Sequence, residues 1–72
     1  MKVNRYKKSV YIDRVIIECV IMEKTNEEIV RETGYSLGYI KRRLAYLFKL
    51  YNVKSKVGLV REVIKEQLAS MG

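Results

Sequence analysis

No proline interrupts this chain, and its hydrophobic residues recur at helical spacing along almost its whole length. Apolar residues three or four positions apart lie on one face of a helix, whereas a strand would require strict alternation. The strongest local breakers in the 72 residues are four glycines, at positions 34, 38, 58 and 72. The pattern therefore predicts an all-α domain, with a short, flexible basic arm over residues 1–8 and four helices within residues 9–72.

The chain offers little of the chemistry that enzymes, metal sites and disulfides require. It contains no histidine and a single cysteine, Cys19, which excludes both a disulfide within the chain and a Cys/His zinc site. It has no Gly-rich phosphate loop, and a chain this short encloses little volume for a substrate pocket. We therefore expect no enzymatic activity, cofactor, metal or small-molecule substrate, and we interpret Cys19 as a small core residue.

The sequence contains no visible targeting or membrane-spanning segment. Asp13, Arg14 and Glu18 interrupt the apolar run that follows the basic N-terminus, so this run is neither a signal peptide nor a membrane span. One unpaired thiol fits a reducing compartment. We expect a cytoplasmic protein without a membrane partner.

The net charge of +7 is distributed unevenly along the chain. Residues 9–34 contain six acidic and three basic side chains, and residues 57–72 are balanced. The interval 35–56, in contrast, holds six lysines and arginines and no acidic residue. A run of one sign is self-repulsive unless a polyanion neutralises it, so the distribution favours nucleic acid as the partner over a merely solvated basic surface.

Local signals predict two capped helices joined by a tight turn. Thr25 and Glu28 have the spacing of a capping box at the start of a short helix, and Gly34 is suited to the left-handed residue that ends it. Ser36 follows two residues later and can cap the next helix. The helix that Ser36 caps is predicted over about residues 37–51. Two further helices are predicted over about residues 10–22 and 56–70.

The helix predicted over residues 37–51 has three distinct faces at 100° per residue. The core face collects its large apolar side chains, Leu37, Ile40, Leu44, Leu47, Phe48 and Tyr51. The second face combines small residues with long cations, Gly38, Lys41, Arg42, Ala45 and Lys49. Small residues would let the backbone approach a DNA groove while the cations reach base edges, so we interpret this face as DNA-reading rather than simply solvated. The third face contains candidates for phosphate contact or for ordinary surface, Tyr39, Arg43, Tyr46 and Leu50.

The last predicted helix has a wider apolar stripe than one small core needs. One band is expected to close the core and consists of Val57, Val60, Ile64, Leu68 and Met71. Leu59 and Val63 widen the stripe, and we expect this surplus to pair with a second copy through Leu59, Val60 and Val63. Val63→Glu should then prevent dimerisation and Ile64→Glu should unfold the chain. A single broad buried stripe is the alternative interpretation.

A resemblance to the LuxR/GerE-type helix-turn-helix family covers residues 25–60 without a gap. The residues that match the family pattern are Thr25, Asn26, Glu28, Ile29, Val30, Gly34, Ser36, Ile40, Lys41, Val53, Lys54, Ser55 and Lys56. The sequence departs from that pattern at Glu23 and Asn52, where family members carry glycine. It also departs at Tyr39, which replaces a threonine, and at Arg43, which replaces a frequent histidine.

The resemblance implies a bacterial, stand-alone transcriptional regulator that binds double-stranded DNA in the nucleoid. Its third helix would lie in the major groove, and its fourth helix would pair in a homodimer. Together with the helical faces, it assigns the base contacts to Gly38, Lys41, Arg42 and Ala45. The backbone contacts are expected from Thr25, Ser36, Tyr39, Arg43, Lys49, Ser55 and Lys56. RNA polymerase is a further candidate partner.

Two other interpretations remain open at the level of sequence. A sigma-factor region-four-like module has the same Glu-Glu-Ile-Val, Gly and Ser features but does not need a wide fourth helix. A small helical adaptor or antirepressor would instead bind a transcription protein through the fourth helix and the basic face. The salt dependence of binding to random duplex DNA separates a DNA binder from an adaptor. Only a DNA binder releases counterions, so only its affinity falls steeply as the salt concentration rises.

Overall fold

A computed structural model describes the backbone of residues 5–71 and the side chains of residues 11–71. Within these residues the fold is all-helical, with no strand. The helices are α1 (Arg5–Ile21), α2 (Asn26–Thr33), α3 (Leu37–Leu50) and α4 (Lys56–Met71). No helix in this part of the chain has both the length and the apolar content to cross a membrane.

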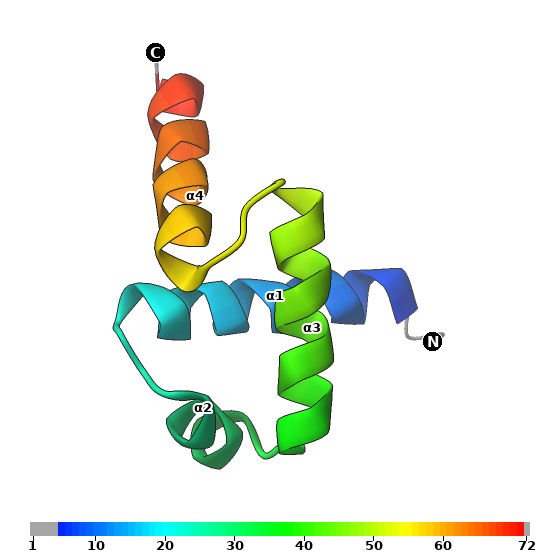
Figure 1. Cartoon of the computed structure of the whole chain (residues 1–72). Helices are drawn as coiled ribbons and strands as arrows, with labels where there is room; N and C mark the ends of the chain where they lie inside the picture. The colour runs from blue at the N-terminus through cyan, green and yellow to red at the C-terminus, as the bar shows by residue number, and fades with distance from the viewer. Residues whose placement is uncertain (1–4, 72) are drawn as a thin grey trace.

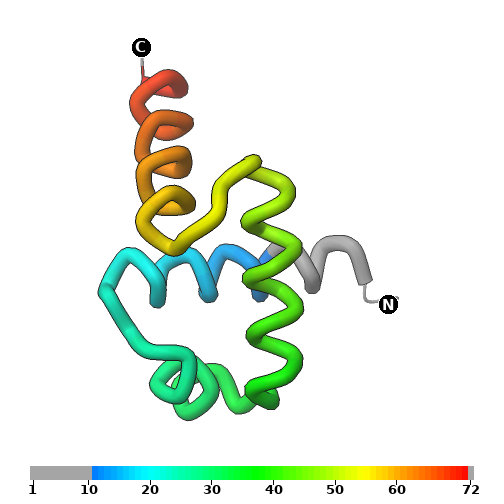
Figure 2. The backbone as a smooth tube through the Cα atoms, viewed as in Figure 1, coloured from blue at the N-terminus to red at the C-terminus, as the bar shows by residue number. Residues whose placement is uncertain are grey.

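The helix α1 is the element around which the other helices are arranged. It packs against both α3 and α4, while α2 packs against α3 (Figure 1). The connection from α2 to α3 is a short turn at the bottom of the view, and the connection from α3 to α4 returns the chain to α1 (Figure 2). The C-terminal half of α4 projects beyond the rest of the molecule (Figure 1).

The start of α1 differs from the sequence-based expectation. The helix begins at Arg5 rather than near Val10, so residues 5–8 of the predicted flexible arm are helical. Lysine and arginine lose little rotamer freedom in a helix, and no glycine or proline intervenes to stop it. The rest of that arm, residues 1–4, lies outside the described residues.

The core forms where α3 and α4 cross α1. The predicted stripe of α1 is confirmed, because Ile12, Ile16, Cys19 and Val20 are all buried. From the other helices, the buried hydrophobic residues are Ile29, Ile40, Leu44, Leu47, Leu59 and Val63. Side chains such as Phe48 and Tyr51 pack against this cluster while partly exposed. One small contiguous core therefore connects all four helices.

The predicted turn between α2 and α3 is confirmed in its details. Thr25 and Glu28 form a complete capping box at the start of α2. Gly34 ends α2 with φ +79°, and its amide donates to the Val30 carbonyl. The hydroxyl oxygen of Ser36 then accepts from the Tyr39 amide at 3.1 Å and caps α3. These contacts satisfy backbone groups that a helix end leaves unpaired, and they fix the turn at three residues.

Two other helix ends use left-handed residues that are not glycine. Glu23 has φ +61° after α1, and Asn52 has φ +55° after α3. At each of these ends, the amide that follows the left-handed residue donates to a carbonyl in the last turn of the helix. The Lys24 amide donates to the Cys19 carbonyl at 3.0 Å, and the Val53 amide donates to the Phe48 carbonyl at 2.8 Å. This is the Schellman arrangement, which favours glycine at the left-handed position. Asparagine tolerates that conformation, whereas glutamate is strained in it.

The assignment of the two apolar faces of α4 from sequence was wrong. Leu59 and Val63 are 0% and 6% exposed and lie in the core, so these two residues are not available for a dimer interface. The band expected in the core points outward instead, with Val57 79% and Ile64 45% exposed. Val60 lies between the two faces and is partly buried.

The reversal has a physical reason in packing, because apolar residues lie on two faces of α4 and only the face with Leu59 and Val63 joins the core cluster. Gly58 is buried where α4 passes the loop before it, and a Cβ added there would lie 3.0 Å from Cβ of Val53. A side chain at position 58 would therefore press against Val53, and glycine permits this close approach of the loop to the start of α4.

We predict that Glu23→Gly stabilises the protein, raising the free energy of unfolding by about 0.5–1 kcal/mol. Glycine removes the left-handed strain at this position, which outweighs its added freedom in the unfolded chain. Glu27→Gly is the matched control, because it makes the same replacement inside α2 and should destabilise. Urea denaturation measures both. Equal destabilisation by the two changes would contradict a left-handed Glu23.

We also predict opposite results from glutamate at adjacent positions of α4. Val63→Glu places a carboxylate in the core and should cost more than about 4 kcal/mol, which unfolds a domain of this size. Ile64→Glu adds the same charge on the exposed face and should leave a folded, helical monomer. Circular dichroism with thermal melting measures both. Cooperative melting of Val63→Glu near the wild-type temperature would contradict the orientation of α4.

Candidate nucleic-acid interface

The exposed face of α3 carries a row of cations beside two small residues. Lys41, Arg42 and Lys49 are exposed, as are Gly38 and Ala45 between and beside them. A Cβ at Gly38 would meet only the Arg42 guanidinium, at 3.6 Å, so the backbone at the start of α3 is open to a close approach. The structure therefore brings together on one face all four residues proposed to contact bases.

Arg43, which was expected from sequence to contact a phosphate, is engaged in an ion pair within the molecule. Its guanidinium forms a bidentate ion pair with Asp13 of α1, with Nε–Oδ1 and Nη2–Oδ2 distances of 2.8 and 2.6 Å. The hydrogen bonds to Asp13 raise the pKa of Arg43. The guanidinium also lies 4.6 Å from the ring centroid of Tyr46, on the flank of α3. Its charge is neutralised inside the molecule.

Three hydroxyl residues expected at the DNA backbone act as helix caps. The hydroxyl oxygens of Thr25, Ser36 and Ser55 accept from the amides of Glu28, Tyr39 and Gly58. A cap uses a lone pair of the oxygen, and the O–H is still a donor for a phosphate. These three residues are thus held at helix starts, where amide dipoles favour anions.

Lys56 is held beside the start of α2. Its ammonium donates to Oδ1 of Asn26 at 2.7 Å, although the two residues are 30 positions apart. This bond places Ser55 and Lys56, at the start of α4, near Thr25 at the start of α2. An ammonium has three donors, so Lys56 can bind Asn26 and a phosphate at the same time.

Tyr39 lies at the border between the cationic face and the core. Its ring stacks on that of Tyr35, with centroids 4.8 Å apart and planes 26° apart. It packs against the core cluster and is only partly exposed. Its position is therefore fixed by packing, and of its side chain only the phenol hydroxyl has the chemistry to reach a phosphate.

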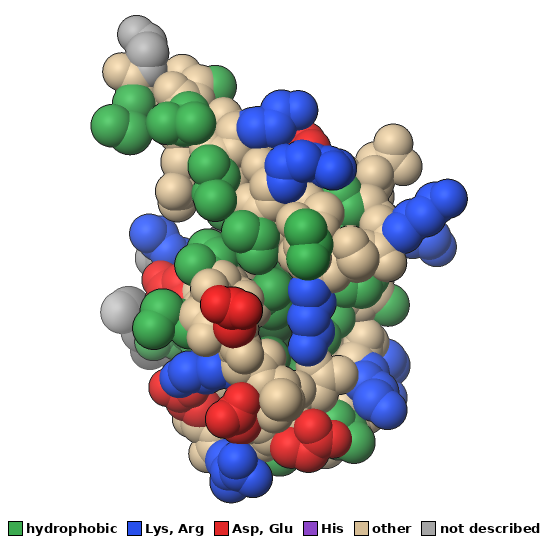
Figure 3. All heavy atoms as spheres, turned by 60° about the vertical axis from the view of Figure 1, so that its left-hand side comes forward, with side chains coloured by type: hydrophobic (Ala, Val, Ile, Leu, Met, Phe, Trp, Pro, Cys, Tyr) green, Lys and Arg blue, Asp and Glu red, His purple; other side chains and the backbone are tan. Residues whose placement is uncertain are grey.

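The acidic residues lie mainly away from the cationic face. Most of the acidic side chains in Figure 3 lie in its lower half, where some cations accompany them, and other cations lie along the right-hand edge and at the top. At the start of α2 the capping box lowers the pKa of Glu28, chiefly through the hydrogen bond from the Thr25 amide. The interval 35–56 itself contains no acidic residue, so no acidic side chain of α3 lies beside the exposed Lys41, Arg42 and Lys49.

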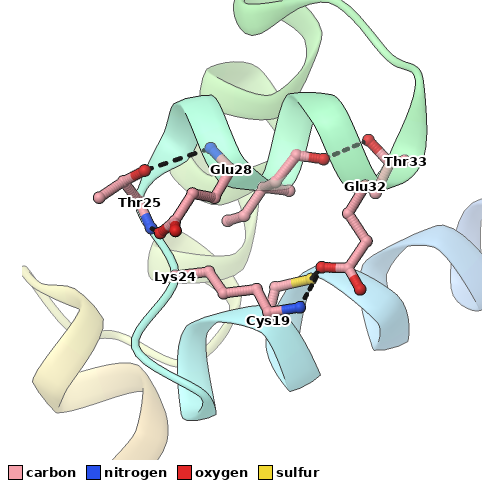
Figure 4. Close-up of polar contacts among 7 residues, drawn as sticks. Cys19, Lys24, Thr25, Glu28, Glu32 and Thr33 are labelled. Carbon is pink, nitrogen blue, oxygen red and sulfur yellow. Dashed lines mark hydrogen bonds and ion pairs between the residues drawn. The ribbon is translucent and has the colours of Figure 1, made fainter.

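Cys19 of α1, Lys24 and Glu32 of α2 form a polar contact between the two helices. Glu32 pairs with Lys24 and accepts a weak hydrogen bond from the Cys19 thiol at 3.8 Å (Figure 4). Burial, and then the Glu32 charge, raise the pKa of Cys19. Within the described residues, no group of three His, Cys, Asp or Glu side chains is arranged to hold a metal ion.

Sequence reasoning missed Asp13 and Asn26, the partners of Arg43 and Lys56. Each pair joins residues 30 positions apart and belongs to no local pattern, so a single sequence carried no signal for either. No protein-family model, curated protein or solved structure matches this chain. The geometry of the chain's own residues therefore carries the functional argument.

Proposed function

We propose that this protein binds double-stranded DNA through the exposed face of α3 and acts as a sequence-specific transcriptional regulator of the LuxR/GerE type. The observation that carries the proposal is the row Lys41, Arg42 and Lys49 beside Gly38 and Ala45. An α-helix fits the major groove, where lysine and arginine bind guanine edges and small residues permit close approach. The helix pair α2–α3 with its three-residue turn is the layout of a helix-turn-helix.

The conformation of two turn residues supports the family resemblance independently of charge. Glu23 and Asn52 occupy the positions where the family carries glycine, and both have positive φ. Glycine is favoured at such positions because it has no Cβ to clash. A glycine would therefore suit the backbone at both positions, and this supports the proposed resemblance even though the residue type differs.

The residues proposed at the DNA backbone lie on α3 and at the starts of α2 and α4. Lys49 lies on the exposed face of α3, while Thr25, Ser55 and Lys56 lie where α2 and α4 begin. Ser36 and Tyr39 mark the start of α3. Hydroxyl, amide and ammonium donors of this kind set the register of a protein on a duplex without reading sequence. Arg43 is no longer included in this group.

A homodimer through the outward face of α4 completes the proposal. The exposed band consists of Val57, Ile64, Leu68 and Met71, with the partly buried Val60 at its border. Leu68 and Met71 are 63% and 82% exposed on the projecting end of the helix, and hydrophobic side chains run from there onto the body (Figure 3). The spacing is close to that of a helix-pairing seam, and a two-fold contact would place two copies of α3 on successive turns of DNA.

The exposed band also supports a second candidate, a helical interaction module that binds a transcription protein. This module would bind the transcription protein through α4 and the basic face of α3, and not DNA. The log–log slope of affinity for random duplex DNA against salt decides between the two, with about −0.9 expected for each phosphate neutralised. A slope near zero would favour the interaction module.

We predict that Lys41→Ala and Arg42→Ala each weaken binding to a site selected from a random duplex library by about 1–3 kcal/mol, and random DNA by less. Lys49→Ala should weaken all sequences alike and make the salt slope shallower by about 0.9. Lys65→Ala, on the charged side of α4, is the control and should change neither. Fluorescence anisotropy at several salt concentrations gives both quantities. Identical behaviour of the three α3 variants would contradict this division of roles.

We predict that Ile64→Glu abolishes the homodimer, because paired carboxylates would be buried against each other at a two-fold contact. Ala69→Glu is the matched control, with the same new charge on the opposite, exposed side of the same helix. Sedimentation velocity, with and without a palindromic duplex, measures the assembly. A dimer of Ile64→Glu as stable as the Ala69→Glu dimer would exclude this face.

A further inference from the structure

We infer that Asp13 and Arg43 are positioning residues, which fix the rotation of α3 about its own axis and so decide which base edges Lys41 and Arg42 can reach. The inference rests on the proposed function and adds to it a contribution to specificity from residues that do not contact DNA.

The ion pair has the geometry of a rigid link between two helices. Two parallel hydrogen bonds, of 2.8 and 2.6 Å, join the planar guanidinium to both carboxylate oxygens. The side chains of Arg43 and Asp13 are only 23% and 14% exposed. A bidentate pair constrains orientation as well as distance, which a single lysine contact would not do.

The apolar contacts of α3 hold it against the body but do not define its rotation as strictly. Ile40, Leu44 and Leu47 bury one stripe of the helix, and burial of apolar surface is not directional. The ion pair adds a directional contact on one side of that stripe. The Tyr46 ring, 4.6 Å from the same guanidinium, limits its movement further.

A small rotation would be enough to disrupt base contacts. A roll of about 20° moves a side-chain tip about 6 Å from the helix axis by about 2 Å. Hydrogen bonds tolerate a spread of only about 0.5 Å in length. Arg43 directly follows Arg42 and Lys41, so fixing its side chain fixes the backbone that carries the two proposed base-reading residues.

The charge of Asp13 makes the inference testable against simple electrostatics. Asp13→Asn removes a negative charge, and by charge alone it should strengthen binding to every DNA sequence. If Asp13 positions α3, the same variant should bind the selected site more weakly while binding to random DNA is unchanged or stronger. The ratio of the two affinities separates the two outcomes.

The experiment compares full-length wild type with Asp13→Asn, Arg43→Gln and Arg43→Lys on the duplex selected by the wild type and on random duplex DNA. Asp13→Asn and Arg43→Gln should each lower the specificity ratio at least about fivefold, the discrimination of one well-made base contact. Arg43→Lys keeps the charge and one hydrogen bond, so it should remain folded and still lose specificity. Binding is measured below the melting temperature of each variant.

Arg14→Gln is the matched control for the change of charge. Arg14 is 80% exposed on the same helix as Asp13, and its 3.9 Å contact with Glu18 lies within α1. This variant should leave the specificity ratio unchanged. An unchanged ratio in Arg43→Lys, or a shallower salt slope in Arg43→Gln, would overturn the inference and favour a phosphate contact. Failure of the wild type to select any sequence would overturn the proposed function as well.

Discussion

The crossing of α3 over α1 is the contact on which the rest of the molecule depends. Ile16 and Ile40 are fully buried there, and both α2 and α4 attach to the structure on either side of that contact. A domain this short buries a modest share of its surface and has no disulfide to restrain the unfolded chain. The same few apolar side chains that hold the domain together therefore also hold the proposed recognition helix against the body, and the Asp13–Arg43 ion pair adds a directional contact between α1 and α3.

The parts of the fold that sequence predicted well are those with local causes. The capping box at Thr25, the left-handed Gly34 and the Ser36 cap each depend on residues within a few positions, so their types alone indicate the conformation. The buried stripes of α1 and α3 follow from periodicity in the same way. Once the buried stripe of α3 is known, the residues on its other faces are expected to be exposed. The exposure of the candidate base-reading residues could therefore be predicted from sequence.

The parts that sequence did not predict depend on contacts between distant residues. The helix α4 has apolar residues on two faces, and periodicity cannot say which of them meets α1 and joins the core cluster. Similarly, Arg43 lies next to exposed cations, and only the position of Asp13 across the helix crossing turns its charge inward. No residue pattern in the sequence predicted that α1 begins at Arg5, since a flexible arm and a helix can share the same composition.

The arrangement of charge on α3 has a consequence for how such a small protein can be selective. Neutralising Arg43 inside the molecule removes one cation that would attract any phosphate, and it uses that cation to orient the helix instead. A polyanion binder gains affinity from every exposed cation, but discrimination comes from the few that are held in register with base edges. The pairing of Arg43 with Asp13 therefore exchanges sequence-independent attraction for orientation of the proposed reading face.

The two faces of α4 connect folding to the proposed assembly. Its inner face, with Leu59 and Val63, completes the monomer core, while its outer face leaves Ile64, Leu68 and Met71 in contact with water. Since the last turns of the helix project away from the body, a monomer gives them little tertiary support, and isolated helical turns are marginal in water. A second copy on this face would supply that support, so helix formation at the end of α4, dimerisation and occupation of a two-part DNA site should reinforce one another.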